Sequence, residues 1–187
     1  MKKLAIIIIC ALLLVAAIVF ALFAVNNIRE YLYPREYSEY VTRYAKEYKV
    51  PESLVYAIIY NESSFNEEAV SRVGAIGLMQ LMPDTVDWLS RVMGESAPDT
   101  EISNPEINIK YGTYYIRHLY DRFDNWDTAI AAYNAGHGRV GGWLADERYS
   151  DDGITLKLIP ITETKNYVNR VKDTQNQYKT LYYNGED

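Results

Sequence analysis

Residues 51–65 read PESLVYAIIYNESSF, and this stretch decides the fold because it joins a helical apolar pattern to an acid. One stripe of a helix, spaced at i, i+3, i+4 and i+7, holds Val55, Ile58, Ile59 and Glu62. Three members of the stripe are apolar, so we expect it to face a core. Glu62 would then occupy a buried position, the alternative being that it turns to solvent at a frayed helix end.

A buried carboxyl at position 62 would have chemical consequences. Burial disfavours the charged form of a carboxyl and raises its pKa. A carboxyl that keeps its proton near pH 7 is what general acid catalysis requires. Glu62 is therefore the first candidate for a catalytic residue.

The start of the 187-residue chain is not globular. Residues 4–25 form an unbroken apolar run, and a helix needs about 20 such residues to span a bilayer. A cleavable secretory signal has a shorter apolar core, of roughly 7–15 residues, and a small-residue cleavage site, which this run lacks. We therefore expect a membrane anchor rather than a cleaved signal. Lys2 and Lys3 favour a cytoplasmic N-terminus, which places everything after Asn26 outside the membrane.

The same observations predict the domain organisation. We expect residues 1–26 to be a cytoplasmic stub and transmembrane anchor, residues 27–35 a juxtamembrane linker, and residues 36–187 one catalytic domain. A domain of about 150 residues buries well over half of its unfolded surface, so it can fold without covalent cross-links. The only cysteine, Cys10, lies in the apolar run as a small hydrophobic residue, and the domain therefore has no disulfide.

Composition argues against several classes of function. The net charge is −6 and there is no basic block, which argues against nucleic acid as a partner. The chain has two histidines, no H-E-x-x-H motif and no Cys/His cluster, so we expect neither a metal site nor a cofactor. Four of the 18 tyrosines recur at helical spacing, and we expect this stripe to belong to the core: Tyr37, Tyr40, Tyr44 and Tyr48.

The remaining pattern is helical, with a weak strand signal throughout. We expect helices over residues 36–49, 51–63, 126–135 and 162–183, and others that begin at Pro83 and at Pro105. Asn104 and Thr162 are the expected N-caps of two of these helices. Residues 136–142 carry four glycines and are expected to be a loop, while residues 145–160 suit a short hairpin or extended turn. His118 is expected to pack on its helix rather than to act in chemistry.

Four motifs then appear in order along the chain. They are ESSFN at 62–66, GAIGLMQLMP at 74–83, AYNAG at 132–136 and ETKNYV at 163–168. Together they resemble the catalytic domain of the soluble lytic transglycosylase family. The resemblance spans residues 51 to about 175 and leaves out the apolar run, the linker and the last dozen residues. No role follows from it for Lys165, the basic residue of the fourth motif.

The resemblance implies roles for particular residues of this sequence. Glu62 would be the catalytic acid and base, and no metal would take part. The remaining matched positions would bind the glycan: Ser71, Gln80, Met82, Tyr133, Asn134, Glu163 and Tyr167. The family's fold is mainly α and lysozyme-like, related to goose-type lysozyme. Its members cut peptidoglycan between N-acetylmuramic acid and N-acetylglucosamine and leave a 1,6-anhydro sugar.

The residues themselves are compatible with such chemistry. An ordinary glycosidase uses two carboxylates, about 5–5.5 Å apart if retaining and about 6.5–9.5 Å apart if inverting. The other acids near the motifs are expected to be surface or cap residues: Glu67, Glu68, Asp84 and Asp127. One acid suffices if the nucleophile is a hydroxyl of the substrate, because a held hydroxyl has a high effective molarity. Tyr133 and Asn134 would then orient the sugar.

Several alternatives stay open from sequence alone. One alternative is that Gly74 and Gly77 are needed only for backbone turns and have no functional role. Another is that Met79 and Met82 fill the core rather than line the groove. A muramidase on the same fold would need Asp84 or Asp127 on the sugar face opposite Glu62. A non-catalytic glycan-binding module would not need Glu62 at all. The expected partners are peptidoglycan strands and the membrane, while endo or exo action, stem-peptide preference, protein partners and oligomeric state are not predicted.

Overall fold

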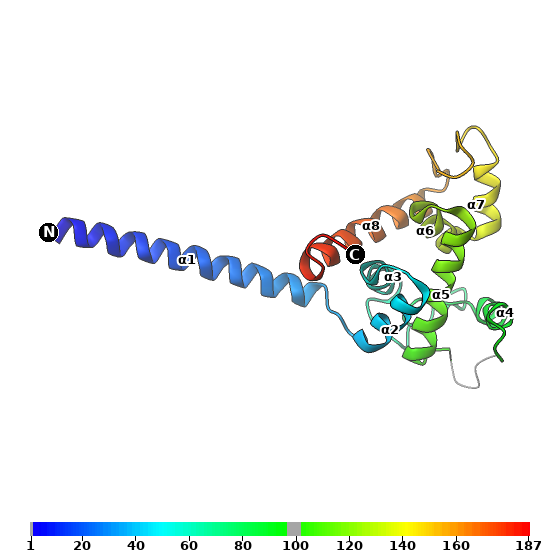
Figure 1. Ribbon diagram of the computed structural model, residues 1–187, viewed down its shortest axis with the longest axis horizontal. Coiled ribbons are helices and arrows are strands. Elements are labelled where there is room, and N and C mark those ends of the chain that lie inside the picture. Colours follow the sequence, from blue (N-terminus) through cyan, green and yellow to red (C-terminus); the bar gives the residue numbers. More distant parts are fainter. Residues whose placement is uncertain (1, 97–101) are drawn as a thin grey trace. The chain divides into compact units, whose positions relative to one another are not determined.

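The computed structural model describes residues 2–96 and 102–187. The chain divides into two units, Met1–Pro34 and Arg35–Asp187. The first unit holds one helix, α1 (Lys2–Leu32). The second holds the other described helices, all visible in Figure 1: α2 (Ser38–Tyr48), α3 (Glu52–Ser63), α4 (Pro83–Met93), α5 (Pro105–Phe123), α6 (Trp126–Ala135), α7 (His137–Leu144) and α8 (Thr162–Tyr182).

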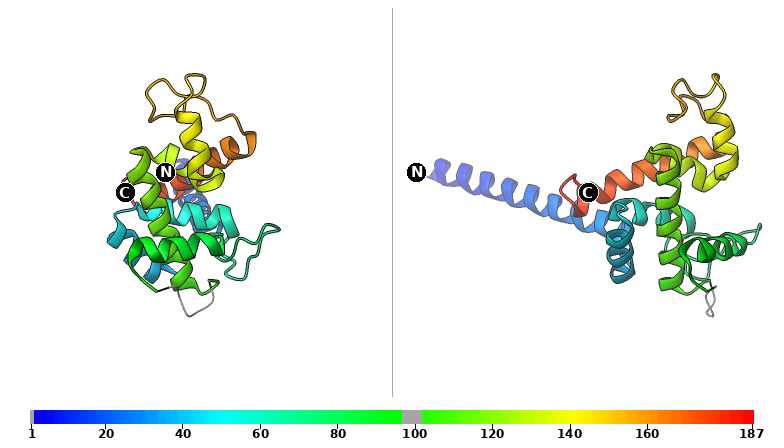
Figure 2. Two further views of the ribbon diagram at one scale, coloured as in Figure 1. Left: turned by 90° about the vertical axis from the view of Figure 1, so that its right-hand side faces the viewer. Right: turned by 45° about the vertical axis from the view of Figure 1, so that its right-hand side comes forward.

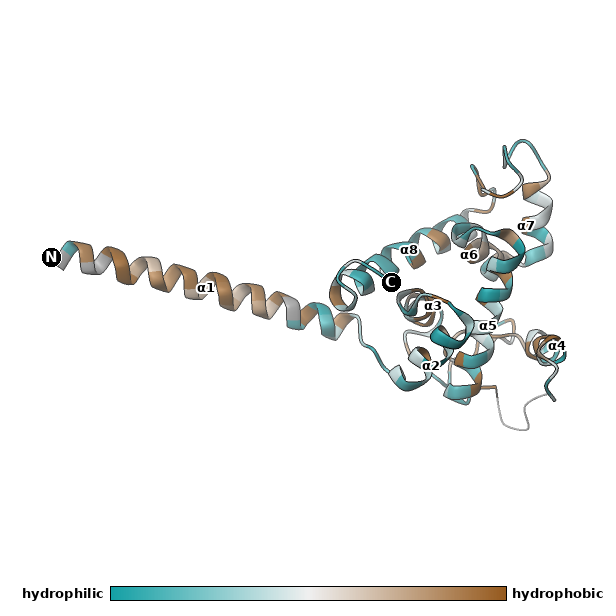
Figure 3. Ribbon diagram, viewed as in Figure 1, coloured by the Kyte–Doolittle hydropathy of each residue, from teal (hydrophilic) through white to brown (hydrophobic). Residues whose placement is uncertain are grey.

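Helix α1 is apolar along most of its length, as the hydropathy colouring in Figure 3 shows. The segment Ile7–Leu32 is long and apolar enough to cross a membrane, and a secretory signal has the same features. The helix continues to Leu32, so residues 27–32 of the predicted linker are helical and residues 33–35 are irregular. Met1, the first residue of the predicted stub, lies outside the described residues.

Helix α3 forms the centre of the second unit. Val55, Ile58 and Ile59 are fully buried, which confirms the predicted stripe. Burial extends round the whole helix, because residues 53–59 are all buried. The cause is that α3 packs against α8 and also against α2 (Figure 1). A helix covered on several sides has no polar face, so its amphipathic pattern is incomplete.

The other helices begin largely where the local signals place them. α4 begins at Pro83 and α5 at Pro105, each with proline in its first turn. The Asn104 side chain accepts a hydrogen bond from the backbone N–H of Ile107 at 3.2 Å, which confirms the predicted cap. α8 begins at Thr162 as predicted, but its N-cap residue is Ile161 and Thr162 supplies no cap. α5 packs against α2 and α6, and α6 packs against α7 and α8.

The predicted tyrosine stripe was only partly correct. Tyr44 is buried, but Tyr37, Tyr40 and Tyr48 are half-buried. The difference arises because α2 packs against α3 and α5 on one side only and leaves its other side to solvent. Tyr37 donates to Glu67 at 3.0 Å, and Tyr44 donates to Glu106 at 2.9 Å.

Residues 137–142 form most of helix α7 rather than a loop, so that prediction was wrong. Gly136 does end α6, with a φ of +88° that favours glycine. After it, Val140 is fully buried, and α7 packs against α6. The local cost of glycine in a helix, about 1 kcal/mol per residue, is therefore outweighed by tertiary packing.

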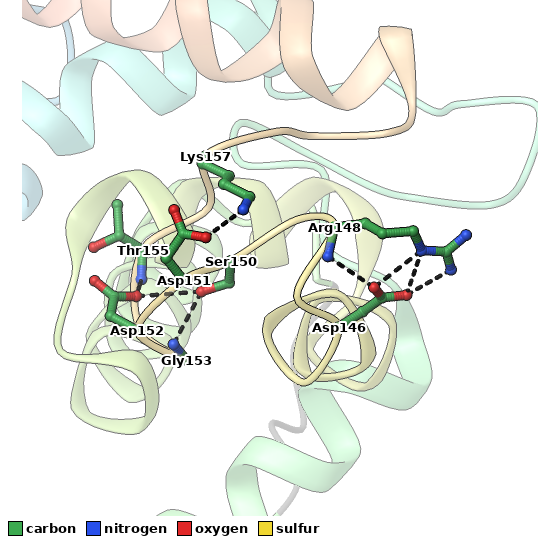
Figure 4. Close-up of polar contacts among 8 residues, drawn as sticks. All are labelled: Asp146, Arg148, Ser150, Asp151, Asp152, Gly153, Thr155 and Lys157. Atoms are coloured by element: carbon green, nitrogen blue, oxygen red, sulfur yellow. Dashed lines mark hydrogen bonds and ion pairs between the residues drawn. The ribbon is translucent and has the colours of Figure 1, made fainter.

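Residues 145–160 form turns and bends rather than a hairpin. Figure 4 shows that they are held by their own polar contacts. The Asp152 carboxylate accepts from the backbone N–H groups of Ile154 and Thr155 at 2.8 and 2.7 Å. The Ser150 hydroxyl accepts from the N–H of Gly153 at 3.0 Å. These short-range bonds stabilise a compact loop that connects α7 to α8.

The segment between α3 and α4 carries three of the expected glycan contacts and is fixed by a buried amide. It contains isolated antiparallel bridges from Ile76 to Val70 and to Leu81, and it projects at the right of the left-hand view in Figure 2. The fully buried Asn108 of α5 accepts from the N–H of Met79 at 2.7 Å. It donates to the carbonyl of Ile76 at 2.9 Å. One side chain from α5 therefore positions the segment.

Candidate active site

Glu62 lies on the last turn of α3 and faces a cavity. The surrounding atoms remove most of its water, and this burial raises its pKa to about 7. Two groups oppose the shift: the hydroxyl of Tyr167 donates to Glu62 Oε1 at 2.6 Å, and Arg170 contributes positive charge. The bond to Oε1 leaves Oε2 as the oxygen that can carry the proton.

Two tyrosines flank this carboxyl from different helices: Tyr167, which is buried, and Tyr133, which is half-buried. Burial, together with the nearby Glu62 charge, raises the pKa of Tyr167 and of Tyr133 well above the usual value. Both hydroxyls therefore keep their protons and act as hydrogen-bond donors. Tyr133, on α6, donates to the carbonyl of Met79 at 2.8 Å, and its ring lies 5.1 Å from that of Tyr115. Tyr133 thereby ties α6 to the segment before α4.

The cavity that contains Glu62 has a volume of about 350 Å³. It is lined by seven of the eight residues expected from sequence: Glu62, Ser71, Gln80, Met82, Tyr133, Asn134 and Glu163. A neighbouring cavity of about 240 Å³ shares four of these residues and continues towards Tyr115 and Gly136. The two cavities form one groove. The eighth expected residue, Tyr167, reaches the site through its bond to Glu62.

Ser71 and Gln80 shape the wall of the groove. The Ser71 hydroxyl accepts from the backbone N–H of Ala75 at 2.9 Å and so closes a turn. Gln80 has a φ of +48° and uses its amide nitrogen to bind the carbonyls of Ala69 and Gly77, at 3.0 and 2.9 Å. Its amide oxygen accepts no hydrogen bond from residues 2–96 and 102–187, so it is available to a ligand.

The two open questions about glycine and methionine have structural answers. Met79 is fully buried and packs on Gly112, whereas Met82 is 38 % exposed and lines both cavities. Gly77 has a φ of +79°, and a Cβ there would lie 2.4 Å from Asn108 Nδ2. Gly74 has a φ of +88° with open space around it, so its backbone turn requires glycine.

The opposite side of the groove combines α6 with the start of α8. Asn134 is exposed, and its Oδ1 accepts a hydrogen bond from the hydroxyl of buried Thr164 at 2.8 Å. That bond occupies the amide oxygen of Asn134 and leaves its NH₂ group as the donor that a ligand can use. Glu163 lines the same cavity as Glu62, yet it is not among the groups that shift the pKa of Glu62. We infer that the two carboxyls are not in direct contact.

Sequence reasoning missed two residues that support the site. Thr164 holds Asn134, and Arg170 acts on Glu62 and lies with its guanidinium 6.0 Å from the centre of the Tyr167 ring. Arg170 follows Tyr167 by three positions, which places both on one face of α8. That spacing was the only signal in the sequence that could have identified Arg170.

The other acids are not arranged around Glu62. Asp127 is ion-paired with Lys172 and Glu67 accepts from Tyr37. Asp84 and Glu68 are exposed, and neither lines the groove. His118 packs edge-to-face on Trp88 with ring centres 5.0 Å apart, as expected for a packing residue. Within residues 2–96 and 102–187, no three His, Cys, Asp or Glu side chains are grouped closely enough to hold a metal ion.

The fold and site together define a class of protein: a mainly helical domain with one largely desolvated acid in an open groove. The chain belongs to the transglycosylase SLT domain family, whose model matches residues 39–155. Two curated relatives are similar over most of the chain. The soluble lytic murein transglycosylase of Escherichia coli K12 is 36 % identical over 159 residues, which cover 82 % of this chain and 24 % of that protein. The membrane-bound lytic murein transglycosylase C of Edwardsiella ictaluri is 31 % identical over 173 residues, covering 78 % and 47 %.

Solved structures give the same assignment of fold. An inactive mutant of the lytic transglycosylase Slt from Pseudomonas aeruginosa superposes with a TM-score of 0.73 at 36 % identity, over 83 % of this chain and 25 % of that one. The 70 kDa soluble lytic transglycosylase of Escherichia coli gives 0.73 at 33 % identity, over 84 % and 26 %. The chain therefore spans about a quarter of the length of these soluble relatives.

Proposed function

We propose that the chain is a lytic transglycosylase that cleaves peptidoglycan between N-acetylmuramic acid and N-acetylglucosamine. The observation that carries this proposal is the state of Glu62, a carboxyl with a pKa of about 7 in the wall of a groove. At neutral pH such a group is about half protonated, so it serves both as an acid and as a base. Membership of the family and the names of its relatives support the same activity.

The proposed reaction needs one protein carboxyl. Glu62 gives its proton to the glycosidic oxygen, and the bond from that oxygen to C1 of the muramic sugar breaks. The Glu62 carboxylate then takes the proton of the C6 hydroxyl of the same sugar, and the C6 oxygen bonds to C1. The result is a 1,6-anhydro ring, with Glu62 returned to its protonated form. No water is consumed.

The remaining groove residues are proposed to position the sugar. The NH₂ group of Asn134, fixed by Thr164, is a donor for a sugar oxygen, and the free amide oxygen of Gln80 is an acceptor for a hydroxyl. Tyr133 excludes water beside Glu62, and Met82 gives an apolar contact at the rim. Tyr167 stabilises the carboxylate that forms after the first proton transfer. Ser71 and Glu163 complete the cavity wall.

Mass spectrometry of released muropeptides tests the proposal. The full chain in detergent is incubated with purified peptidoglycan, and Glu62→Gln is the matched variant. We expect products about 18 Da lighter than hydrolysed muropeptides, the mass of the water that is not added, and we expect the variant to release none. Products with a free reducing end would mean that water is the nucleophile. No product from either protein would refute the enzymatic proposal and favour a glycan-binding module.

A muramidase is the second candidate function, and one observation bears on it. Asp84 and Asp127, the acids that it was expected to need, do not line the groove. Glu163 does line the groove, and it is the acid that would have to activate water. If the protein released products with a free reducing end and Glu163→Gln abolished that activity, Glu163 would be the second carboxylate that a muramidase requires.

We further propose that α1 anchors the domain to a membrane, with residues 1–26 as stub and anchor, 27–35 as linker and 36–187 as the catalytic domain outside. The length and composition of α1 and the existence of membrane-bound relatives support this arrangement. Protease treatment of intact cells tests it, because an external domain is degraded while a cytoplasmic one is protected. Release of the domain without α1 would indicate a cleaved signal instead.

A further inference from the structure

A cavity of about 210 Å³ lies on the side of α8 that faces away from the groove. Its walls are residues 156–159, the first half of α8, and Asp127 at the start of α6. It shares no lining residue with the two cavities of the groove. The proposed reaction makes no use of this cavity, so its chemistry requires a separate account.

The charge of this α8 cavity is opposite to that of the chain. Lys157, Lys165 and Lys172 line it together with a single acid, Asp127, which gives three positive charges against one negative in a chain of net charge −6. Lys172 pairs with Asp127, and Lys157 pairs with Asp151 outside the cavity. No salt bridge involves Lys165 within residues 2–96 and 102–187, and its side chain is exposed. Lys165 is therefore the cation available to a ligand.

The walls beside these lysines are partly apolar. Val168 is almost fully buried at the base, and Leu158 is 48 % exposed at the rim. A ligand that satisfies both features has one negative charge next to small aliphatic groups. The Asp127 carboxylate at the same rim disfavours a doubly charged anion such as phosphate. The free carboxylate end of a peptide with small side chains has the required chemistry.

The position of the cavity relates such a peptide to the groove. Glu163 lines the groove and Tyr167 bonds to Glu62, while Lys165 and Val168 line the cavity, so the two sites lie on either side of one helix. An α-helix is about 10–12 Å wide, so a path round half of it is roughly 16–19 Å, and an extended peptide of five to six residues spans that distance at about 3.3 Å per residue. A peptide of that length, attached to a sugar in the groove, can therefore pass round α8.

We propose that the α8 cavity binds the free carboxylate end of a wall peptide borne by the glycan strand in the groove, with Lys165 as its cation. This inference rests on the proposed function, because the peptide is delivered by the glycan substrate. It makes the enzyme distinguish glycan that carries peptides from bare glycan, through contacts remote from Glu62.

A binding titration tests the cavity without any catalysis. The full chain in detergent is titrated by NMR with N-acetyl-tetra-alanine that has a free C-terminal carboxylate, and with the same peptide as its C-terminal amide. We expect saturable binding of the carboxylate form, weakened about tenfold in Lys165→Glu and retained in Lys165→Arg. Lys46→Glu, an exposed lysine of α2 outside both sites, is the matched control. Equal binding of the acid and the amide, or no loss in Lys165→Glu, would overturn the proposal.

A turnover measurement then tests the source of the peptide. Glycan strands with their peptides, and strands stripped by an amidase, are given to the wild type and to Lys165→Glu. We expect the variant to raise KM at least about threefold on peptide-bearing strands and to leave stripped strands unaffected. If the wild type cleaves neither substrate, the proposed function fails while the binding result still decides on the cavity. If Lys165 instead bound an acidic protein, and the peptide did not bind, the assignment of the cavity to a wall peptide would be overturned.

Discussion

Helices α1 and α3 are both strongly apolar, yet they are buried to opposite extents. The chain buries none of the apolar span of α1, whereas residues 53–59 of α3 are all buried. The polar residues account for the difference. The apolar run of α1 is uninterrupted, while α3 ends in Asn61, Glu62 and Ser63, which all bond to or face protein groups. The apolar residues of a helix thus indicate that it avoids water. Its polar residues, where present, indicate that it packs within the protein.

If apolar side chains of α1 stabilised the folded domain as much as those of α3 do, the distinction between the two helices would be wrong. Ile58→Ala removes a fully buried side chain from α3 and should lower the free energy of unfolding by about 4 kcal/mol. Leu13→Ala, in exposed α1, should leave the unfolding of the domain unchanged. Tryptophan fluorescence during urea denaturation in detergent measures both, because all three tryptophans lie in the second unit. Equal losses from the two substitutions would contradict the distinction.

The acid at the end of α3 gives the next largest effect. Because the folded protein holds the pKa of Glu62 near 7, above its ordinary value of 4.5, the folded state binds this proton more tightly than the unfolded state. Its contribution to stability is complete below pH 4.5 and is lost as the pH rises through 7. Glu62→Gln should therefore gain stability relative to the wild type across this interval, by up to about 3 kcal/mol. Denaturation at pH 4, 6 and 8 measures the difference, and a constant difference would show that Glu62 is not desolvated.

Tyr167 extends the comparison, because this residue of α8 donates a hydrogen bond to the Glu62 carboxylate of α3. Its hydroxyl stabilises the carboxylate, so Tyr167→Phe should raise the pKa of Glu62 above 7. The alkaline limb of the kcat/KM profile should then move up by about one pH unit. Tyr133→Phe is the matched variant, because Tyr133 bonds to a backbone carbonyl and not to Glu62. A shift of equal size in both variants would assign the effect to general repacking.

The smallest effect is expected from the removal of α1. The two units are separate, and the second contains the whole groove. Deletion of residues 1–26 should give a soluble, folded and active protein whose free energy of unfolding changes by less than about 0.5 kcal/mol. Size-exclusion chromatography, denaturation and muropeptide release measure the three properties. Aggregation of the shortened chain would place part of α1 within the folded domain.

Local patterns predicted the features that depend on local physics. The stripe of Val55, Ile58 and Ile59 located the central helix, and the prolines at 83 and 105 located the starts of two others. The four motifs led to the residues that line the groove, and the roles assigned to them stay predictions. In each case, the signal lies within a few residues of the feature it predicts.

Features that depend on distant partners were not predictable in this way. The bond from Tyr167 to Glu62 joins residues 105 positions apart, and no spacing rule indicates it. α7 was missed because its glycines disfavour a helix locally, whereas burial of Val140 against other elements favours one. The tyrosine stripe was misjudged because helical spacing does not indicate how much of α2 is covered by α3 and α5, which leave Tyr37, Tyr40 and Tyr48 half-buried.

Asn108 has a consequence for the dynamics of the groove. Its side chain bonds to the backbone of Met79, Ile76 and Ile102, so the segment that carries Gln80 and Met82 is fastened to the first turn of α5. Loops usually open with a small free energy, and their amide hydrogens exchange quickly with solvent. Here the amide hydrogen of Met79 can exchange only when its hydrogen bond to the buried side chain of Asn108 breaks. The groove wall is therefore expected to open only when the core opens, so that a ligand meets a preformed surface.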